Sequence, residues 1–329
     1  VQTCALPISG VLFLLISVTP IRERIASAIP SHLRYATAAG IGLLLTFIAL
    51  RNVGILQADP VTVVRLGAID HRSILLLGGL VLAVVLTRRG NPLAYLAAIA
   101  SVTGAAWAFG YAAPPTALVS LPDFSSVFLK LDVRGALALS LLPSTISILF
   151  TDLFDSLSTF IGVATAAKLT TEDGHPIDLR RGLIVDAVAT FGAGLAGTSS
   201  GTAYVESIAG IRMGGRTGFA SVVTALCFLP CLFVAPLAAA VPAYATAPVL
   251  VLVGVAMFQS ITQVRFDAIE EAVPAFVPLV LIPLTLSITQ GILCGFLVHV
   301  VLHTAVGRGR DVPLTLWLLA ALSAFLLLL

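Results

Sequence analysis

Long apolar runs constrain the fold of this chain more than any other feature. Runs of roughly 15 to 25 residues, separated by short stretches with Gly, Pro and Arg, recur along the sequence, and each is long enough to cross a bilayer as a helix. Charged residues make up 10% of the chain, against about 25% in soluble domains. The alternating ten-residue pattern of a membrane barrel is absent from the sequence. The sequence therefore predicts an all-α polytopic membrane protein, whose expected spans include residues 34–50, 181–197 and 217–241.

The basic residues divide unequally between alternate loops of these expected spans. With the loop that holds Arg22, Arg24 and Arg34 taken as cytoplasmic, thirteen of the 18 lysines and arginines fall on that side. Such an excess of positive charge marks the cytoplasmic side of membrane proteins. We therefore expect a multi-pass protein of the inner, cytoplasmic membrane, embedded in the lipid bilayer. The net charge of +2 is spread over short loops, so no nucleic acid partner is expected.

Two carboxylates interrupt one apolar run, in the stretch TDLFDSLSTFIG at residues 151–162. A helix wheel at about 100° per residue places Asp152 and Asp155 on one polar side, and leaves Ser156 as an exception on the apolar side. An ionised side chain at the bilayer centre costs at least about 2.5 kcal/mol, so an acid there indicates a functional site. Two structural alternatives stay open: Asp152 faces a neighbouring helix, or Asp155 only braces helices through hydrogen bonds.

A second unusual stretch, TSSGTAYVESIAGIR at residues 198–212, is too polar at its start and too short for a normal span. Its first residues have low helix propensity, and the helical pattern that follows has Glu206 in its first turn. An extended segment that leads into a half-helix exposes backbone N–H groups at membrane depth, as in many secondary transporters. We expect Thr198, Ser199 and Tyr204 to form such a site with Glu206, unless that glutamate only braces helices.

A third acid, Asp186, lies in the small-residue helix predicted at residues 181–197, where a structural or proton-relay role is favoured over substrate contact. Apart from arginines at their first residues, the expected spans hold no Lys or Arg, so these acids must be protonated, hydrogen-bonded, or meet a ligand or cation. The four cysteines form no C-x-x-C motif, and His299 and His303 alone are a weak metal signature. We expect neither a metal ion nor another cofactor.

Five motifs, in order along the chain, resemble those of the AzgA-like purine permeases, a branch of the nucleobase transporter superfamily. They are TDLFDSLSTFIGVA (151–164), GLIVDAVATFGAG (182–194), TSSGTAYVESIAGI (198–211), GRTG (215–218) and PAYATAPVLVLVGVAM (242–257). The resemblance runs from about residue 10 to the C-terminus. It implies the fold of that superfamily, with fourteen segments in two inverted repeats of seven and a short extended strand in segment 10.

The resemblance also implies a division into domains. Residues 1–8 look like a sequencing-adapter artefact, and residues 9–31 look like a remnant of segment 4 with its loop. The gate domain is expected at 32–134 (segments 5–7) and at 242–329 (segments 12–14 plus a C-terminal hydrophobic segment). The core domain, with segments 8–11, is expected at 135–241. The chain is thus expected to be N-terminally truncated. Without segment 3, the strand at 198–203 would lack its partner, and we expect an open site and no transport by this fragment alone.

The function implied by the resemblance is proton-coupled import of hypoxanthine, guanine or adenine, without catalysis. Asp152 and Asp155 match the acidic pair of segment 8, and Glu206 matches the binding glutamate of segment 10. Proton coupling is then assigned to Asp155, Glu206 and Asp186, and the resemblance is compatible with a homodimer. Ser158 and the pair Ser200–Gly201 depart from the pattern of many relatives, which bears on substrate choice.

Other functions remain open at this point. An anion or sulfate permease of the same architecture is disfavoured by three acids, because an anion site calls for a cation or dipoles. An intramembrane aspartyl enzyme is disfavoured because Asp186 follows Leu-Ile-Val instead of G-x-G, and a D-x-x-D prenyltransferase because the sequence shows no further acidic motif for magnesium. A nonfunctional truncated fragment is the last alternative.

Overall fold

The computed structural model of the protein describes residues 28–115, 117–125, 128, 177–198, 201–204, 207–212, 214–215 and 217–328, with positions 152, 156, 159, 160, 163 and 164. The elements are α3 (Ser31–Val53), β1 (Leu56–Asp59), β2 (Val63–Leu66), α4 (His71–Arg88), α5 (Ala94–Ala108), α8 (Leu179–Ala196), α9 (Ser207–Arg212), α10 (Gly218–Phe228), η1 (Leu229–Leu232), α11 (Ala235–Ala239), η2 (Ala243–Ala245), α12 (Ala247–Phe258), η3 (Gln259–Gln263), α13 (Ile269–Thr285), α14 (Ile288–Ala305), η4 (Gly309–Asp311) and α15 (Leu314–Leu328).

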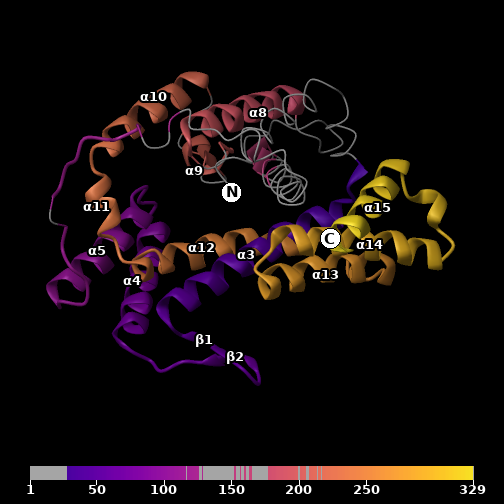
Figure 1. Cartoon of the computed structure of the whole chain (residues 1–329), viewed down its shortest axis with the longest axis horizontal. Coiled ribbons are helices and arrows are strands. Elements are labelled where there is room, and N and C mark those ends of the chain that lie inside the picture. Colours follow the sequence, from indigo (N-terminus) through magenta and orange to yellow (C-terminus); the bar gives the residue numbers. More distant parts are fainter. Residues whose placement is uncertain are drawn as a thin grey trace.

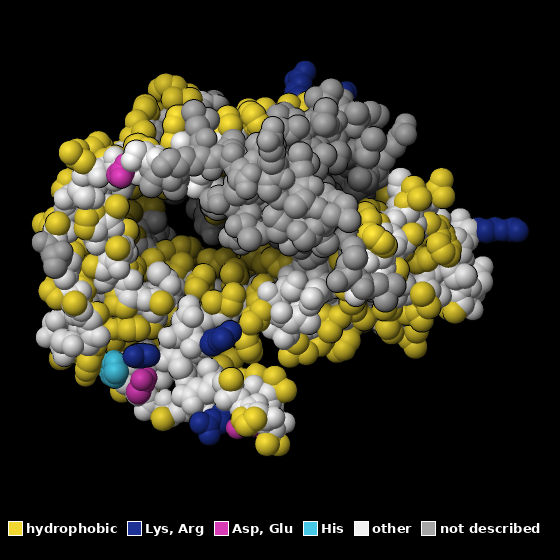
Figure 2. Space-filling model, viewed as in Figure 1, with side chains coloured by type: hydrophobic (Ala, Val, Ile, Leu, Met, Phe, Trp, Pro, Cys, Tyr) yellow, Lys and Arg dark blue, Asp and Glu magenta, His cyan; other side chains and the backbone are white. Residues whose placement is uncertain are grey.

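The predicted helical membrane protein is confirmed in its described part. Helices α3, α4 and α14 are long and apolar enough to cross a bilayer, and shorter apolar helices occur at Ala94–Ala108, Gly218–Leu232, Ala247–Gln263 and Leu314–Phe325. Figure 2 shows hydrophobic side chains spread over the described face, with few charged side chains among them. Such a surface suits lipid rather than water.

The single long span expected at Thr217–Val241 is wrong in detail, because the helix is broken twice. Helix α10 ends at Phe228, a 3-10 turn follows, and α11 begins at Ala235. Pro230 and Pro236 stand at the starts of the two later pieces. Proline has no N–H to donate and clashes with the preceding turn, so each one ends the helix before it.

The helices form one elongated band with a second group beside it (Figure 1). Helices α3, α12, α13 and α14 lie along the band, and α3 packs against both α12 and α13. Helices α8 and α9 lie to one side of the band, and the chain returns to it through α10 and α11.

Small residues allow α3 and α12 to cross at backbone contact. A Cβ atom added to Gly42 would lie 2.5 Å from the Gly254 carbonyl oxygen and 3.0 Å from the Phe258 nitrogen. No side chain larger than hydrogen fits there. Close approach through small residues is the usual source of helix association in a bilayer, where van der Waals contact replaces the hydrophobic effect.

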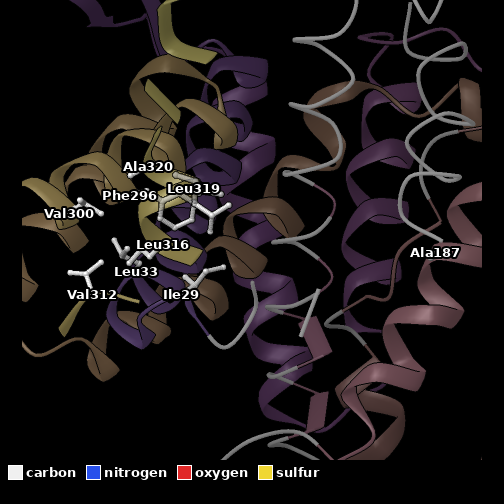
Figure 3. Close-up of a cluster of buried hydrophobic side chains, with 10 residues drawn as sticks. Ile29, Leu33, Ala187, Phe296, Val300, Val312, Leu316, Leu319 and Ala320 are labelled. Carbon is white, nitrogen blue, oxygen red and sulfur yellow. The ribbon is translucent and has the colours of Figure 1, made fainter. Parts of the chain in front are cut away.

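A cluster of buried apolar side chains joins the start of α3 to α14 and α15 (Figure 3). Phe296 is its largest member, at 1% exposed, and it packs among Ile29, Leu33 and Leu316. Ala187 belongs to the same cluster but comes from α8, and it lies apart from the other labelled residues in this view. A second cluster joins the end of α3 to α4, α5 and α12.

A β-hairpin between α3 and α4 departs from the predicted all-α fold. Strands β1 and β2 pair antiparallel, with Leu56 opposite Leu66 and Asp59 opposite Val63. The Asp59 carboxylate accepts backbone N–H groups of Thr62 and Val61, which close the turn and hold the pKa of Asp59 below its usual value. The sequence carries local signals for this hairpin, namely the turn pair Asp-Pro and the β-branched run that follows it.

Candidate functional site

The predicted polar helix of residues 151–162 presents a buried polar face to α8. Its described helical positions include Asp152, Ser156 and Thr159, which are 6%, 0% and 3% exposed. These residues are spaced four and three apart, so they stack on one side of a helix. Farther along the same side, the ring of Phe160 packs against Gly182 of α8, where an added Cβ would lie 3.1 Å from the ring.

Ser156 joins this face to the acid of α8. Its hydroxyl donates to Asp186 Oδ2 over 2.6 Å, and the Thr202 hydroxyl lies 3.2 Å from Ser156 Oγ. Because Ser156 uses its hydrogen on the carboxylate, Thr202 is the donor in the second contact. Asp186 is 4% exposed, so the bond satisfies a carboxylate that water scarcely reaches.

Thr190 forms a second connection one helical turn farther along α8. Its hydroxyl lies 3.2 Å from Asp152 Oδ2 and 3.3 Å from the carbonyl oxygen of Gly201, and it donates towards both. Thr190 is completely buried. Ser156 and Thr190 therefore tie the helix around residue 152, helix α8 and the stretch 201–204 into one hydrogen-bonded unit.

The stretch 201–204 is neither helix nor strand and lies directly on α8. A Cβ atom added to Gly201 would lie 2.9 Å from the carbonyl carbon and oxygen of Ala189. The chain approaches the helix this closely only because residue 201 has no side chain. The expected non-helical segment is present at these residues. However, Thr198 and 201–203, the described part of the strand expected at 198–203, form no strand.

The end of α8 shapes the start of this segment. Gly197 adopts a left-handed conformation with φ of 76°, and the Thr198 backbone N–H returns to the Ala193 carbonyl over 2.9 Å. The Thr198 hydroxyl donates to the same carbonyl over 3.3 Å. Thr198 thus closes the helix. Tyr204, at the other end of the segment, is 66% exposed.

The structure describes only some of the predicted site residues. The structure brings Asp152 and Asp186 into one network, whereas Asp155, Ser199 and Glu206 lie outside the described residues. Sequence reasoning missed Ser156, Thr190 and Thr202 as members of the network. The one available signal was spacing, since Ser156 follows Asp152 and Thr190 follows Asp186 by four residues, one helical turn.

The arrangement offers hydrogen-bond acceptors and donors that are buried side by side. Asp186 accepts from the Ser156 hydroxyl and Asp152 from the Thr190 hydroxyl, and the Thr202 hydroxyl contacts Ser156. A hydroxyl group can both donate and accept. Within the described residues, no three His, Cys, Asp or Glu side chains are grouped to hold a metal ion. The site therefore suits a ligand with N–H groups and the transfer of protons.

Comparison with known proteins gives the family. A family model described as "Permease family" matches residues 2–294. The adenine permease AdeQ of Escherichia coli is 38% identical over 96% of this chain and 71% of its own length. The guanine/hypoxanthine permease PbuG of Bacillus subtilis is 34% identical over 93% of this chain and 70% of its own.

A solved structure supports the same fold. The transmembrane domain of the cyanobacterial bicarbonate transporter BicA superposes with a TM-score of 0.65, over 89% of this chain and 75% of that domain. Its sequence identity is 17%, so the likeness concerns the fold alone. With the family model and the relatives, it shows that the chain belongs to the Permease family and is a multi-pass membrane transporter rather than an enzyme.

Proposed function

We propose that this protein imports purine nucleobases across the cytoplasmic membrane together with protons. The observation that carries the proposal is the similarity to permeases for adenine and for guanine/hypoxanthine over more than nine tenths of the chain. The network around Asp152 and Asp186 supports it, because it holds the non-helical stretch 201–204 against α8 and the helix around residue 152.

The described network is best suited to hold the site in shape. Asp186 accepts from Ser156, and Asp152 accepts from Thr190. Thr190 also donates to the Gly201 carbonyl, so these bonds join parts of the protein to one another. On an ideal helix, Asp155 lies about 60° of rotation from Asp152 and about 100° from Ser156, at the edge of the face that meets α8. We assign substrate contact to Asp155 and Glu206, with backbone N–H groups of residues 198–204 as donors.

Proton coupling follows from the same acids. A protonated carboxyl group can donate its hydrogen to a ring nitrogen of the base and accept an N–H at its other oxygen, so the base binds best when the acid carries its proton. Asp155, Glu206 and Asp186 are the proposed carriers. Movement of the core domain (135–241) against the gate domain (32–134 and 242–329) would then alternate access to the two sides.

The direct test is uptake of radiolabelled bases by cells that lack their own purine permeases and express the complete reading frame that encodes this chain. Saturable uptake of hypoxanthine, guanine or adenine, abolished by a protonophore, is the expected result. Uracil is the matched control, because it shares the ring N–H groups and lacks the second ring. Uptake of bicarbonate or sulfate without uptake of any purine would assign the chain to anion transport instead.

A further inference from the structure

Three buried histidines, which transport chemistry does not use, meet where α3 begins and α14 ends. His32 lies in the first turn of α3, and His299 and His303 lie one turn apart in α14. They are 7%, 4% and 7% exposed. Histidine is intermediate among residues in how often it is buried, and the ring nitrogens of three buried histidines need hydrogen-bond partners inside the protein.

The imidazole rings are in direct contact. His32 Nε2 and His299 Nδ1 lie 3.2 Å apart, within hydrogen-bond distance. The rings of His299 and His303 are 3.9 Å apart between centroids, and His303 Nδ1 lies 3.1 Å from the His299 carbonyl oxygen. His303 Nδ1 is therefore the donor to that carbonyl, and its ring rests on the ring of His299.

The bond between His32 and His299 limits how many protons the pair holds. One nitrogen must donate and the other must accept, and an acceptor nitrogen carries no proton. The bond therefore survives in a neutral pair and in a pair with one extra proton, but not when both rings are charged. Two charged rings with centroids 5.1 Å apart would also repel each other in a place with little water.

Among the helices that carry or pack against the cluster, α3, α13 and α14 have ionisable side chains. Glu270, at the start of α13, pairs with Arg308 over 3.0 Å, and Arg308 also holds Asp311 over 3.1 Å. Helix α3 adds the partly buried Arg34 and Tyr35, α13 adds Glu271, α14 adds Cys294, and Leu314–Leu328 of α15 has no ionisable side chain. Among the described residues, Glu270 is therefore the principal anion near His303, and Arg308 opposes it.

We propose that His32, His299 and His303 form a pH-sensitive latch that fastens the first turn of α3 to α14. Leu33 follows His32 and Val300 follows His299, and both belong to the buried apolar cluster that joins α3, α14 and α15 (Figure 3). Double protonation of the His32–His299 pair breaks the bond and loosens this end of the bundle. The latch is closed near neutral pH and opens only below the range in which exposed histidines titrate, because burial and the neighbouring ring both disfavour the second charge. Within that range the unfolded chain takes up protons that the folded pair resists, so the folded state loses stability as the pH falls.

Thermal unfolding in lipid nanodiscs tests the latch through variants. Between about pH 7.5 and about pH 5, a range that spans histidine titration, the melting temperature of the unaltered protein should fall at least about 3 °C more than that of the double variant His32→Gln/His299→Gln. Two glutamine amides keep a hydrogen bond without titrating. His71→Gln is the matched control, because His71 is stacked on Tyr111 outside the cluster, and it should behave as the unaltered protein.

Ring-nitrogen NMR of the unaltered protein, with all five histidines labelled, decides the matter even if the double variant does not fold. As the pH is lowered, the His32 and His299 signals should change together. The hydrogen that the two rings share should then lose its scalar coupling across the bond or its protection from exchange with water. Independent titration of the two rings, or an equal fall in melting temperature with and without the pair, would overturn the latch.

Discussion

The Ser156 hydroxyl lies 2.6 Å from Asp186 Oδ2, and this contact fixes a helix to α8 at a fully buried point. Thr202 adds the non-helical segment to the same hydroxyl over 3.2 Å. A side chain of two heavy atoms thus connects three stretches of chain. If those stretches surround the transported base, their relative positions depend on Ser156.

Ser156→Ala should therefore lower purine uptake by about tenfold to a hundredfold, because a hydrogen bond to a charged group contributes roughly 1.5 to 3 kcal/mol. The measurement is initial-rate uptake, corrected for the amount of protein in the membrane. Ser323→Ala is the matched control, since Ser323 is equally buried but donates only to Leu319 of its own helix. Equal uptake by the two variants would remove Ser156 from the site.

Gly201→Ala tests the close approach of the non-helical segment to α8. The new methyl group would meet the Ala189 carbonyl at 2.9 Å and push the segment away, which weakens the contact between Thr190 and Gly201. Displacement of a binding group by about 1 Å costs on the order of a hundredfold in rate, so we expect uptake to fall by at least about tenfold.

The control for that substitution lies in α8, the helix that Gly201 contacts. Gly192→Ala adds an identical methyl group to α8, where no described residue comes within 4 Å of the new atom. Its uptake and melting temperature should match those of the unaltered protein or improve slightly, since alanine favours helix. Similar losses in both variants would mean that α8 tolerates no added volume, whatever the position of residue 201.

Most helices could be predicted from the sequence because their signal is local. The expected spans at Arg34–Leu50 and Arg181–Gly197 correspond to α3 and α8 within three residues at each end. Apolar composition over a window of this length decides both the helix and its place in the membrane. The break at Pro230 was missed because the apolar run continues through it, although proline marks the break in the sequence itself.

The contacts of the site could not be predicted, because they join positions far apart in the chain. The helix wheel treated Ser156 as an exception on an apolar face, whereas its partner Asp186 is 30 residues away on another helix. The histidine pair is separated by 267 residues. Amphipathic periodicity tells which residues share a side of one helix, but not which helix that side will meet.

Gly42→Ala should lower stability rather than alter the site. The added methyl group meets the Gly254 carbonyl oxygen at 2.5 Å, so α3 and α12 must separate. Overpacking of this kind costs roughly 1 to 3 kcal/mol, which corresponds to a fall of several degrees in melting temperature. Gly78→Ala in α4 is the control, because an added Cβ there has no neighbour within 4 Å in the part of the chain that the structure describes. An unchanged melting temperature for Gly42→Ala would show that the two helices do not depend on this contact.

Glu206→Gln and Asp155→Asn should each abolish purine uptake without preventing insertion into the membrane. Each substitution nearly preserves shape and hydrogen bonding but removes the carboxylate that carries charge and proton. The expected result is loss of proton-coupled uptake at unchanged protein level. Glu271→Gln is a control, because Glu271 lies at the start of α13, outside the candidate site. Retained uptake that still collapses with a protonophore, in either variant, would reassign that acid to bracing helices and leave the coupling to Asp186.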